Sequence, residues 1–332
     1  MDYFIRFAQK SDVDKIMQFI DKYWRKNHIL ARDRELFEWQ YGGNNDKLNI
    51  VIGTDEDGEI QGMLGFIPYD TSDDKDIALA LWKANPSTGF LGLRLLKYLM
   101  DNEPHREIIC PGINLESTSK IYEYVGMKVS TMAQWYRLAK MDTYKIAKVI
   151  DTTISEYKEK EKCVTLIPVD TKEDLKKASE LLHDNKKIVP RKNRPYLLWR
   201  YFDHPEYQYK VFTTNSNDKE GESLFVFRIQ ECNGSKALRM IDCVGNTDKI
   251  KRITPELDRL LLEYECEYVD VYEAGIDDEI FIESGWSKVA ESGNIIPNYF
   301  APYEQRNINI HYSTSNMSAI LFKGDGDQDR PS

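Results

Sequence analysis

Hydrophobic and polar positions along the first 140 residues follow spacings that predict a regular order of strands and helices. Two strand-like runs flank Asp57-Gly58, which is a strong hairpin signal. After a third strand, a helix, a strand and a second helix ending at Gly126 follow. A run of antiparallel strands before a βαβ crossover predicts an α/β fold with a mixed sheet covered by helices. The predicted strands are 3–7, 49–53, 60–67, 77–84 and 107–110, with helices after Ser11, near 37–41, over 90–100 and before 126.

The same order of predicted elements recurs later in the chain. Segments 112–116 and 126–129, Gly-Ile-Asn-Leu-Glu and Gly-Met-Lys-Val, are echoed by 275–279 and 285–289, Gly-Ile-Asp-Asp-Glu and Gly-Trp-Ser-Lys-Val. At 332 residues, the chain is long enough for two ordinary domains. We therefore expect two tandem domains of one kind.

Those two domains are expected at 1–140 and 163–312. Between them, residues 141–162 are charged and helix-prone with apolar residues on one face, which predicts a helical connector packed on the cores. Residues 313–332 are rich in Ser, Asn, Gly and Asp, and this composition predicts a flexible tail.

Composition narrows the classes of function. The hydrophobic content of 41% and charged content of 30% are those of a globular protein. A net charge of −10 opposes binding to a phosphate polymer, so we expect no nucleic-acid partner. Because a membrane span needs about 20 apolar residues and a secretory signal needs a basic start, neither is predicted. We expect a cytoplasmic protein without a membrane partner.

The cysteines and the absent motifs exclude further chemistry. Five scattered cysteines contain no Cys-x-x-Cys pair, so neither disulfides nor a metal site is predicted. A serine-hydrolase elbow, a Walker loop, a zinc-protease motif and a dinucleotide fingerprint are also missing.

A glycine-bearing turn between the third strand and the next helix suits a diphosphate. It includes Gly89 and Gly92, where a Cβ could keep the backbone from the phosphates. Unpaired N–H groups at a helix N-terminus bind phosphate well, and Arg94 and Lys97 add positive charge. Taken alone, such a turn is more often only a turn.

The position of this turn, before a βα unit that ends in Tyr-Glu-Tyr-Val-Gly-Met at 122–127, resembles the Gcn5-related N-acetyltransferase superfamily. The resemblance covers most of 1–140 and extends through the repeat to about 312. It implies a GNAT-like acyl-CoA N-acyltransferase fold and acetyl-CoA as cosubstrate. The residues implied to bind that cofactor are Trp82, Lys83, Ala84, Ser87, Thr88, Gly89, Phe90, Leu91, Gly92, Arg94 and Asn114.

The same resemblance implies direct attack of an amine on an acyl thioester. A backbone N–H near 82–84 would stabilise the oxyanion, and the phenol of Tyr122 would protonate the departing thiolate. The alternative for Tyr122 is a buried core aromatic. His28 or Asp33 would take the proton of the ammonium, the alternatives being a solvated loop histidine and an N-cap.

The second half lacks the glycines of the turn, so we expect one donor site only. Its aromatic and basic stretch at 191–205 suits a nucleotide diphosphate or a sugar, and the alternative is a packing helix. This stretch and the Ile-Pro-Asn-Tyr-Phe turn resemble acyltransferases associated with bacterial surface polysaccharides, which implies an amino-sugar acceptor, free or nucleotide-linked. The implied substrate-binding residues are Arg194, Trp199, Arg200, Asn298 and Tyr299.

Two other functions stay open at this point. Aminoacyl transferases of the peptidoglycan-bridge kind, which use tRNA, also pair two such halves, although the charge of −10 opposes tRNA. A degenerate pair that binds a ligand without turnover is the non-enzymatic alternative. The sequence leaves the oligomeric state open, with a homodimer as one option.

Overall fold

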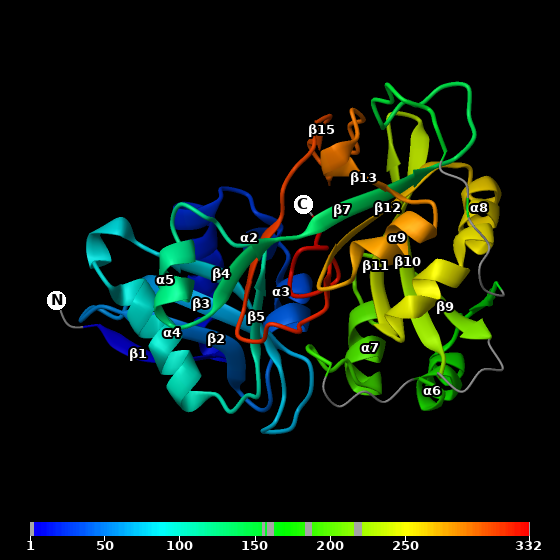
Figure 1. Cartoon of the computed structure of the whole chain (residues 1–332). Coiled ribbons are helices and arrows are strands. Elements are labelled where there is room, and N and C mark those ends of the chain that lie inside the picture. The colour runs from blue at the N-terminus through cyan, green and yellow to red at the C-terminus, as the bar shows by residue number, and fades with distance from the viewer. Residues whose placement is uncertain (1–2, 155–156, 158–162, 183–187, 216–220, 332) are drawn as a thin grey trace.

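Two mixed β-sheets lie side by side, each with helices on both faces (Figure 1). The structure is a computed structural model that describes residues 3–154, 157, 163–182, 188–215 and 221–331. In spatial order, the first sheet consists of β1 (Phe4–Gln9), β2 (Lys47–Thr54), β3 (Ile60–Pro68), β4 (Ile77–Ala84), β5 (Ile108–Pro111), β16 (His311–Thr314) and β6 (Lys128–Thr131). The second sheet consists of β13 (Ser287–Lys288), β7 (Ala133–Leu138), β12 (Cys266–Ala274), β11 (Ser235–Gly245), β10 (Ser223–Cys232), β9 (Lys210–Asn215) and β8 (Thr165–Pro168).

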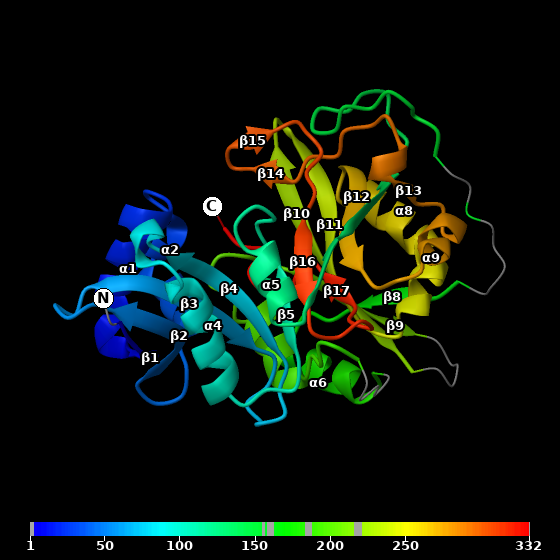
Figure 2. The same ribbon diagram turned by 60° about the vertical axis from the view of Figure 1, so that its left-hand side comes forward.

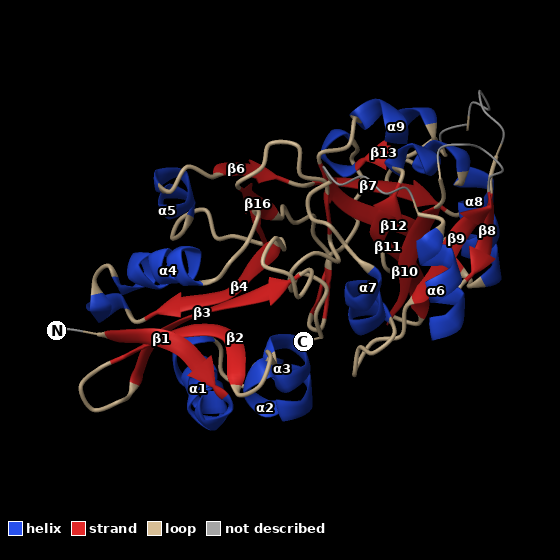
Figure 3. Ribbon diagram, turned by 90° about the horizontal axis from the view of Figure 1, so that it is seen from below, coloured by secondary structure: helices blue, strands red, loops and turns tan. Residues whose placement is uncertain are grey.

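The helices of the first half divide between the two faces of their sheet (Figure 3). Apolar residues of β4 alternate, so that Ala78 and Ala80 pack toward α1–α3 while Ile77 and Leu79 pack toward α4 and α5. The first helical turn begins two residues before the expected Ser11: Gln9 is the N-cap, and Asp12 accepts the Gln9 N–H in a capping box. The helices are α1 (Val13–Phe19), α2 (Ile29–Arg32), α3 (Arg34–Tyr41), α4 (Leu91–Asn102) and α5 (Ser119–Tyr124).

The second half repeats this arrangement. One core cluster lies between the sheet and helices α8 and α9, and α6 and α7 cover the other face. The core under α6 and α7 is continuous with the core under α1–α3, so the two halves share one apolar interior. These helices are α6 (Lys172–Glu180), α7 (Arg194–Tyr201), α8 (Thr254–Glu263) and α9 (Asp278–Glu283).

The two sheets exchange a strand, which the expected boundaries at 140 and 312 do not capture. Strand β7 follows the first half in sequence but pairs antiparallel with β12 of the second sheet. In return, β16 pairs with β5 and β6 of the first sheet (Figure 2). Each sheet therefore contains one strand from the other half of the chain. Local periodicity could not show this exchange, because it carries no information on distant pairing partners.

The expected connector and tail are also corrected. Residues 141–154, the continuous described part of the connector, form no helix; the Glu267 carboxylate accepts N–H groups of Lys145, Ile146 and Ala147 instead. The expected tail contains β16 and β17 (Leu321–Phe322), and Asp325 and Asp329 are at most 1% exposed. Polar composition therefore did not produce disorder here, since its carboxylates find buried partners.

Parallel strands part in both sheets, and the two gaps differ. Strands β4 and β5 pair only at Ile77–Ile108 and Ala78–Ile109 and then diverge. In the second sheet, β17 pairs with the end of β12, and the N–H of Gly324 donates to the Ile241 carbonyl of β11 at 2.8 Å. The chain itself thus occupies the second gap, whereas the first gap stays open toward α4 and α5.

A β-bulge in β4 shapes the open gap. Ala80 pairs with Gly65 and Lys83 with Met63, so that Leu81 and Trp82 together face one position of β3. Leu81 has a φ of 53°, a left-handed conformation that a leucine rarely adopts. The bulge leaves the pairing of β4 with β3 irregular at this point of the strand.

Burial raises the pKa of Glu273, at the end of β12, to about 7 from 4.5. Between pH 4.5 and 7, this carboxyl therefore keeps its proton in the folded protein and loses it in the unfolded chain. Between pH 4.5 and 7, its contribution to the free energy of unfolding should fall by about 3 kcal/mol. Glu273→Gln should lack this component, so its stability relative to the wild type should rise with pH in urea titrations at pH 5, 6 and 7. A variant-to-wild-type difference that stays constant with pH would contradict this prediction.

Candidate active site

A cavity of about 730 Å³ lies at the open gap beside β4. Its walls come from the end of β4, from the start of α4 and from one side of α5. It is large enough for part of a cofactor-sized molecule. The lining residues are Trp82, Lys83, Ala84, Asn85, Pro86, Gly89, Phe90, Gly92, Leu93, Ser117, Thr118, Lys120, Ile121 and Tyr124.

The start of α4 gives the cavity an anion-binding end. Phe90, at the N-cap, supplies no side-chain cap, so N–H groups of the first turn have no intrahelical partner. Gly89 precedes it with a φ of 61°, and a Cβ built there would meet no atom within 4 Å. Lys83 and Lys120 add positive charge around the same space. Free amides, the helix dipole and two ammonium groups together suit a phosphate.

Asn85 supplies a second recognition group. Its Nδ2 donates to Gln61 Oε1 at 2.8 Å, and its Oδ1 is buried without a partner among the described residues. A buried acceptor without a hydrogen bond costs about 1–3 kcal/mol, which a ligand N–H would recover. Asn85 thus brings an unsatisfied amide oxygen to the wall of the cavity, beside its phosphate end.

Gly92 determines how much of the cavity is free. A Cβ built at Gly92 would lie 3.5 Å from the Trp82 indole nitrogen, an ordinary contact. A longer side chain would extend into the space between α4 and Trp82. The expectation from sequence that this glycine keeps the turn accessible thus has a concrete steric basis.

The structure brings six of the expected cofactor residues together and places five elsewhere. Trp82, Lys83, Ala84, Gly89, Phe90 and Gly92 line the cavity. Leu91 is buried against Gly53, and Ser87 is exposed. The Thr88 hydroxyl donates to the Asn85 carbonyl, and Arg94 donates to the Tyr3 carbonyl. Asn114 Oδ1 accepts the N–H groups of Glu116 and Ser117. None of these five is among the residues that line the cavity.

Sequence reasoning missed the wall that α5 contributes. Ser117, Ile121 and Tyr124 all line the cavity. Ile121 and Tyr124 lie three positions apart on one face of α5, and Ser117 lies in the turn just before that helix. That spacing was visible in the sequence, but only the fold shows that this face meets the gap.

Tyr122 lies on the other side of α5, where it is 3% exposed. Its hydroxyl forms a hydrogen bond with the Cys110 thiol. Its ring packs edge-to-face against the Trp82 ring, with the centroids 5.3 Å apart. Burial raises the pKa of Tyr122 well above its usual value, so the phenol stays protonated. This is the buried aromatic that the sequence offered as the alternative, and a role as proton donor to a thiolate stays a prediction.

His28 and Asp33 both cap helices. His28 Nδ1 accepts the Leu30 N–H at 3.2 Å, and Asp33 Oδ1 accepts the Leu36 N–H at 2.9 Å. His28 is buried rather than solvated, and burial together with the Arg330 charge lowers the pKa of its imidazole to about 4. Neither residue lines the cavity. Their assignment as proton acceptors stays a prediction.

The expected acceptor residues of the second half lie between the halves or near them. Trp199 stacks on Trp39 of α3 at 4.5 Å and donates to its carbonyl. Arg194 lines a separate pocket of about 340 Å³. Tyr299 is 48% exposed, in a small hairpin formed by β14 (Tyr299–Phe300) and β15 (Tyr303–Glu304). These three residues surround no common cavity.

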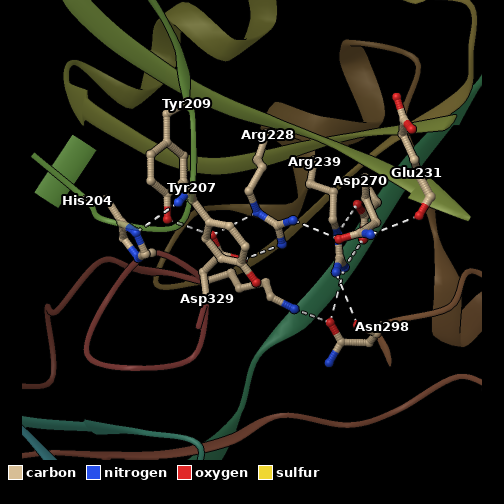
Figure 4. A network of polar contacts seen from close by, with 12 residues as sticks. His204, Tyr207, Tyr209, Arg228, Glu231, Arg239, Asp270, Asn298 and Asp329 are labelled. Atoms are coloured by element: carbon tan, nitrogen blue, oxygen red, sulfur yellow. Dashed lines mark hydrogen bonds and ion pairs between the residues drawn. The ribbon is translucent and has the colours of Figure 1, made fainter. Parts of the chain in front are cut away.

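Arg200 and Asn298 instead hold the end of the chain. Arg200 donates to the carbonyls of Gly324 and Asp329, at 3.3 and 3.0 Å. Asn298 accepts from Arg239 and Lys323. Figure 4 shows Asn298 and Asp329 within one polar network that also contains Arg228, Arg239 and Asp270.

Two other classes of site were sought in the described part of the chain. Among these residues, no group of His, Cys, Asp or Glu side chains could hold a metal ion. No described helix is both long and apolar enough to cross a bilayer.

Solved structures share this fold. A Gcn5-related N-acetyltransferase from Anabaena variabilis matches 94% of this chain and 72% of its own, with a TM-score of 0.56 and 11% identity. A probable N-acyltransferase of unknown function from Enterococcus faecalis matches 93% of this chain and 72% of its own, with a TM-score of 0.53 and 10% identity. No protein-family model and no curated protein matches the chain. The likeness covers more than nine tenths of the chain and shows the mixed α/β fold of these N-acyltransferases, and the two sheets fit a tandem arrangement.

The depressed pKa of His28 generates a stability prediction. A histidine that is neutral in the fold with a pKa of about 4, against 6.5 when unfolded, should weaken the fold as pH falls from 6.5 to 4. The loss should be about 3 kcal/mol. His28→Asn keeps a capping acceptor and removes the titration, so its stability should depend less steeply on pH. Thermal melting of both proteins at pH 7, 5.5 and 4.5 checks this, and parallel curves would contradict it.

Proposed function

We propose that this protein, with the fold of the Gcn5-related N-acetyltransferases, transfers an acyl group from acyl-CoA to a primary amine of a small acceptor. The observation that carries the proposal is the cavity at the open β4–β5 gap, with a glycine-led helix N-terminus at its edge. Acetyl-CoA is the proposed donor. The second half has no equivalent open gap, since β17 occupies its place, so we assign one donor site to the described chain.

The chain's own groups fit the chemical parts of coenzyme A. The free amides at the start of α4, with Lys83 and Lys120, suit its diphosphate. The unpartnered Oδ1 of Asn85 suits an amide N–H of its pantetheine arm. Bound there, the coenzyme would supply an acyl group activated as a thioester.

The bulge in β4 would stabilise the charge of the reaction. Attack of an amine on a thioester places negative charge on the carbonyl oxygen, and a preorganised backbone N–H offsets it. Leu81 and Trp82 share one position opposite β3, so the pairing of β4 with β3 is irregular in this stretch. The strained φ of Leu81 is consistent with a backbone held for function.

The acceptor is proposed to be an amino sugar, free or nucleotide-linked, used in making a cell-surface polysaccharide in the cytoplasm. This part rests on the sequence resemblance of 191–205 and of the turn before Tyr299. Exposed Tyr299 would meet a sugar ring, and Arg194 a phosphate, from the second half.

Gly92→Leu should abolish acetyl-CoA binding, because the side chain would fill the space beside Trp82. Isothermal titration calorimetry should show a loss of at least 100-fold in affinity. Gly92→Ala is the matched control, since its Cβ makes only an ordinary contact and should leave affinity within a few-fold. Both substitutions favour a helix, so neither should unfold α4. Wild-type affinity in Gly92→Leu would remove the assigned donor site.

A further inference from the structure

Residues 323–331, the C-terminal strap, run between the two halves after β17. Three aspartates of the strap are buried: Asp325 is 0% exposed, Asp327 5% and Asp329 1%. Asp325 pairs with Lys192 at 2.9 Å and accepts the Tyr69 hydroxyl at 2.8 Å. Partners from both halves therefore hold the strap in place.

Asp329 anchors the far end of the strap to the second sheet. Its carboxylate accepts two N–H groups of Arg228, at 2.7 and 3.1 Å, and the Tyr209 hydroxyl at 3.0 Å (Figure 4). Burial opposes this charge, but Arg228 and its neighbours lower the pKa of Asp329 below its usual value. A buried ion pair with two hydrogen bonds fixes the position of the Asp329 side chain relative to Arg228.

The middle of the strap crosses the first sheet where β4 and β5 begin to part. A Cβ built at Gly326 would lie 2.8 Å from Pro111 and 3.6 Å from Cβ of Ala78. Gln328 Nε2 donates to the Pro111 carbonyl at 3.1 Å. Ala78 packs toward α1–α3, so the strap lies on the face opposite the donor cavity.

The buried charge of Asp327 acts on groups of α3 and of the loop that carries His28. Burial is the main cause that raises the pKa of the Tyr41 phenol, and the charge of Asp327 is the second. The Tyr41 ring and the Leu81 side chain both lie next to Gly65. The ion-pair partner of Asp327 is Arg330 of the same strap, which lies 5.6 Å from the Trp24 ring. Trp24 in turn stacks on His28 at 4.9 Å.

Asp327 differs from the other carboxylates around this face. Asp325 and Asp329 are bound to cations of the second half, and Asp33 caps α3. The partners of Asp327 belong to the strap itself: Arg330 forms an ion pair with it and Gln328 Nε2 donates to its Oδ1 at 3.4 Å, while the Arg330 side chain keeps 29% of its surface exposed. An incoming ammonium can therefore share this carboxylate without breaking a contact between the halves.

We infer that the C-terminal strap completes the acceptor side of the active site, and that Asp327 binds the acceptor ammonium and takes its proton. This inference rests on the proposed acyl transfer. One N–H proton passes to the Asp327 carboxylate, and the freed nitrogen pair forms a C–N bond to the thioester carbon. The C–S bond then breaks, and the thiolate takes the second proton that the nitrogen loses. Asp327 returns its proton to water, so the products are an amide and the coenzyme thiol.

Asp327→Asn keeps the size of the side chain and removes its charge. With acetyl-CoA and glucosamine or its uridine-diphosphate-linked form, thiol release should fall at least 100-fold in kcat/KM. Asp327→Glu should restore part of this loss, and the Kd for acetyl-CoA should stay within a few-fold. Unchanged or faster turnover in Asp327→Asn would overturn the inference, and faster turnover would identify the strap as a block.

Asp327→Cys gives a second test that needs no acceptor. The new thiol, next to Arg330, should attack bound acetyl-CoA, so that the acetyl group moves to position 327 and the coenzyme thiol leaves. Peptide mass spectrometry should find this site acetylated at least 10-fold faster than the five native cysteines. The double variant with Gly92→Leu should lose the reaction.

The outcomes separate the inference from the proposed function. If Asp327→Cys binds acetyl-CoA with wild-type affinity and is not acetylated at position 327, the inference is overturned and the donor site stands. If the wild type binds no acetyl-CoA by calorimetry, the proposed function is overturned, and the inference with it.

Discussion

Wherever two paired strands part, their backbone N–H and C=O groups lose partners, and something else must satisfy them. This protein meets that constraint twice and in different ways. Between β11 and β12, its own chain enters as β17 and Gly324 donates to Ile241. Between β4 and β5, the gap opens into a cavity with a helix N-terminus at its edge. The two halves of one fold therefore differ at equivalent places, with a cavity in one and a strand in the other.

The filled gap also determines the path of the residues that follow β17. Because β17 is seated between β11 and β12, residues 323–331 must cross from the second sheet to the first. Gly324 and Gly326 fit places where a side chain would meet Ile241 or Pro111. The acidic residues of the strap then meet Lys192 and Arg228, whose charges would be costly to bury alone.

The strand exchange makes the halves one folding unit. Strand β7 contributes Trp135 and Arg137 to the second half, where they contact Glu273 and Asp258. Strand β16 lies between β5 and β6 in the first sheet and pairs with both. Cutting the chain near 140 or 312 would leave each sheet without its exchanged strand. A site that draws on both halves is compatible with such interdependence.

The sequence by itself determined the order of strands and helices up to Gly126, the repeat, the hairpin at Asp57-Gly58 and the glycine-led turn at Gly89 and Gly92. Each of these depends on neighbours within a few positions, through side-chain period, turn conformation or helix capping. Only the tertiary structure decided that β7 and β16 change places, that the turn before α5 presents Ser117 to the cavity and that the charge of Asp327 acts on His28. Those placements join residues up to about 300 positions apart, and their energies come from burial and ion pairing, which local spacing does not encode.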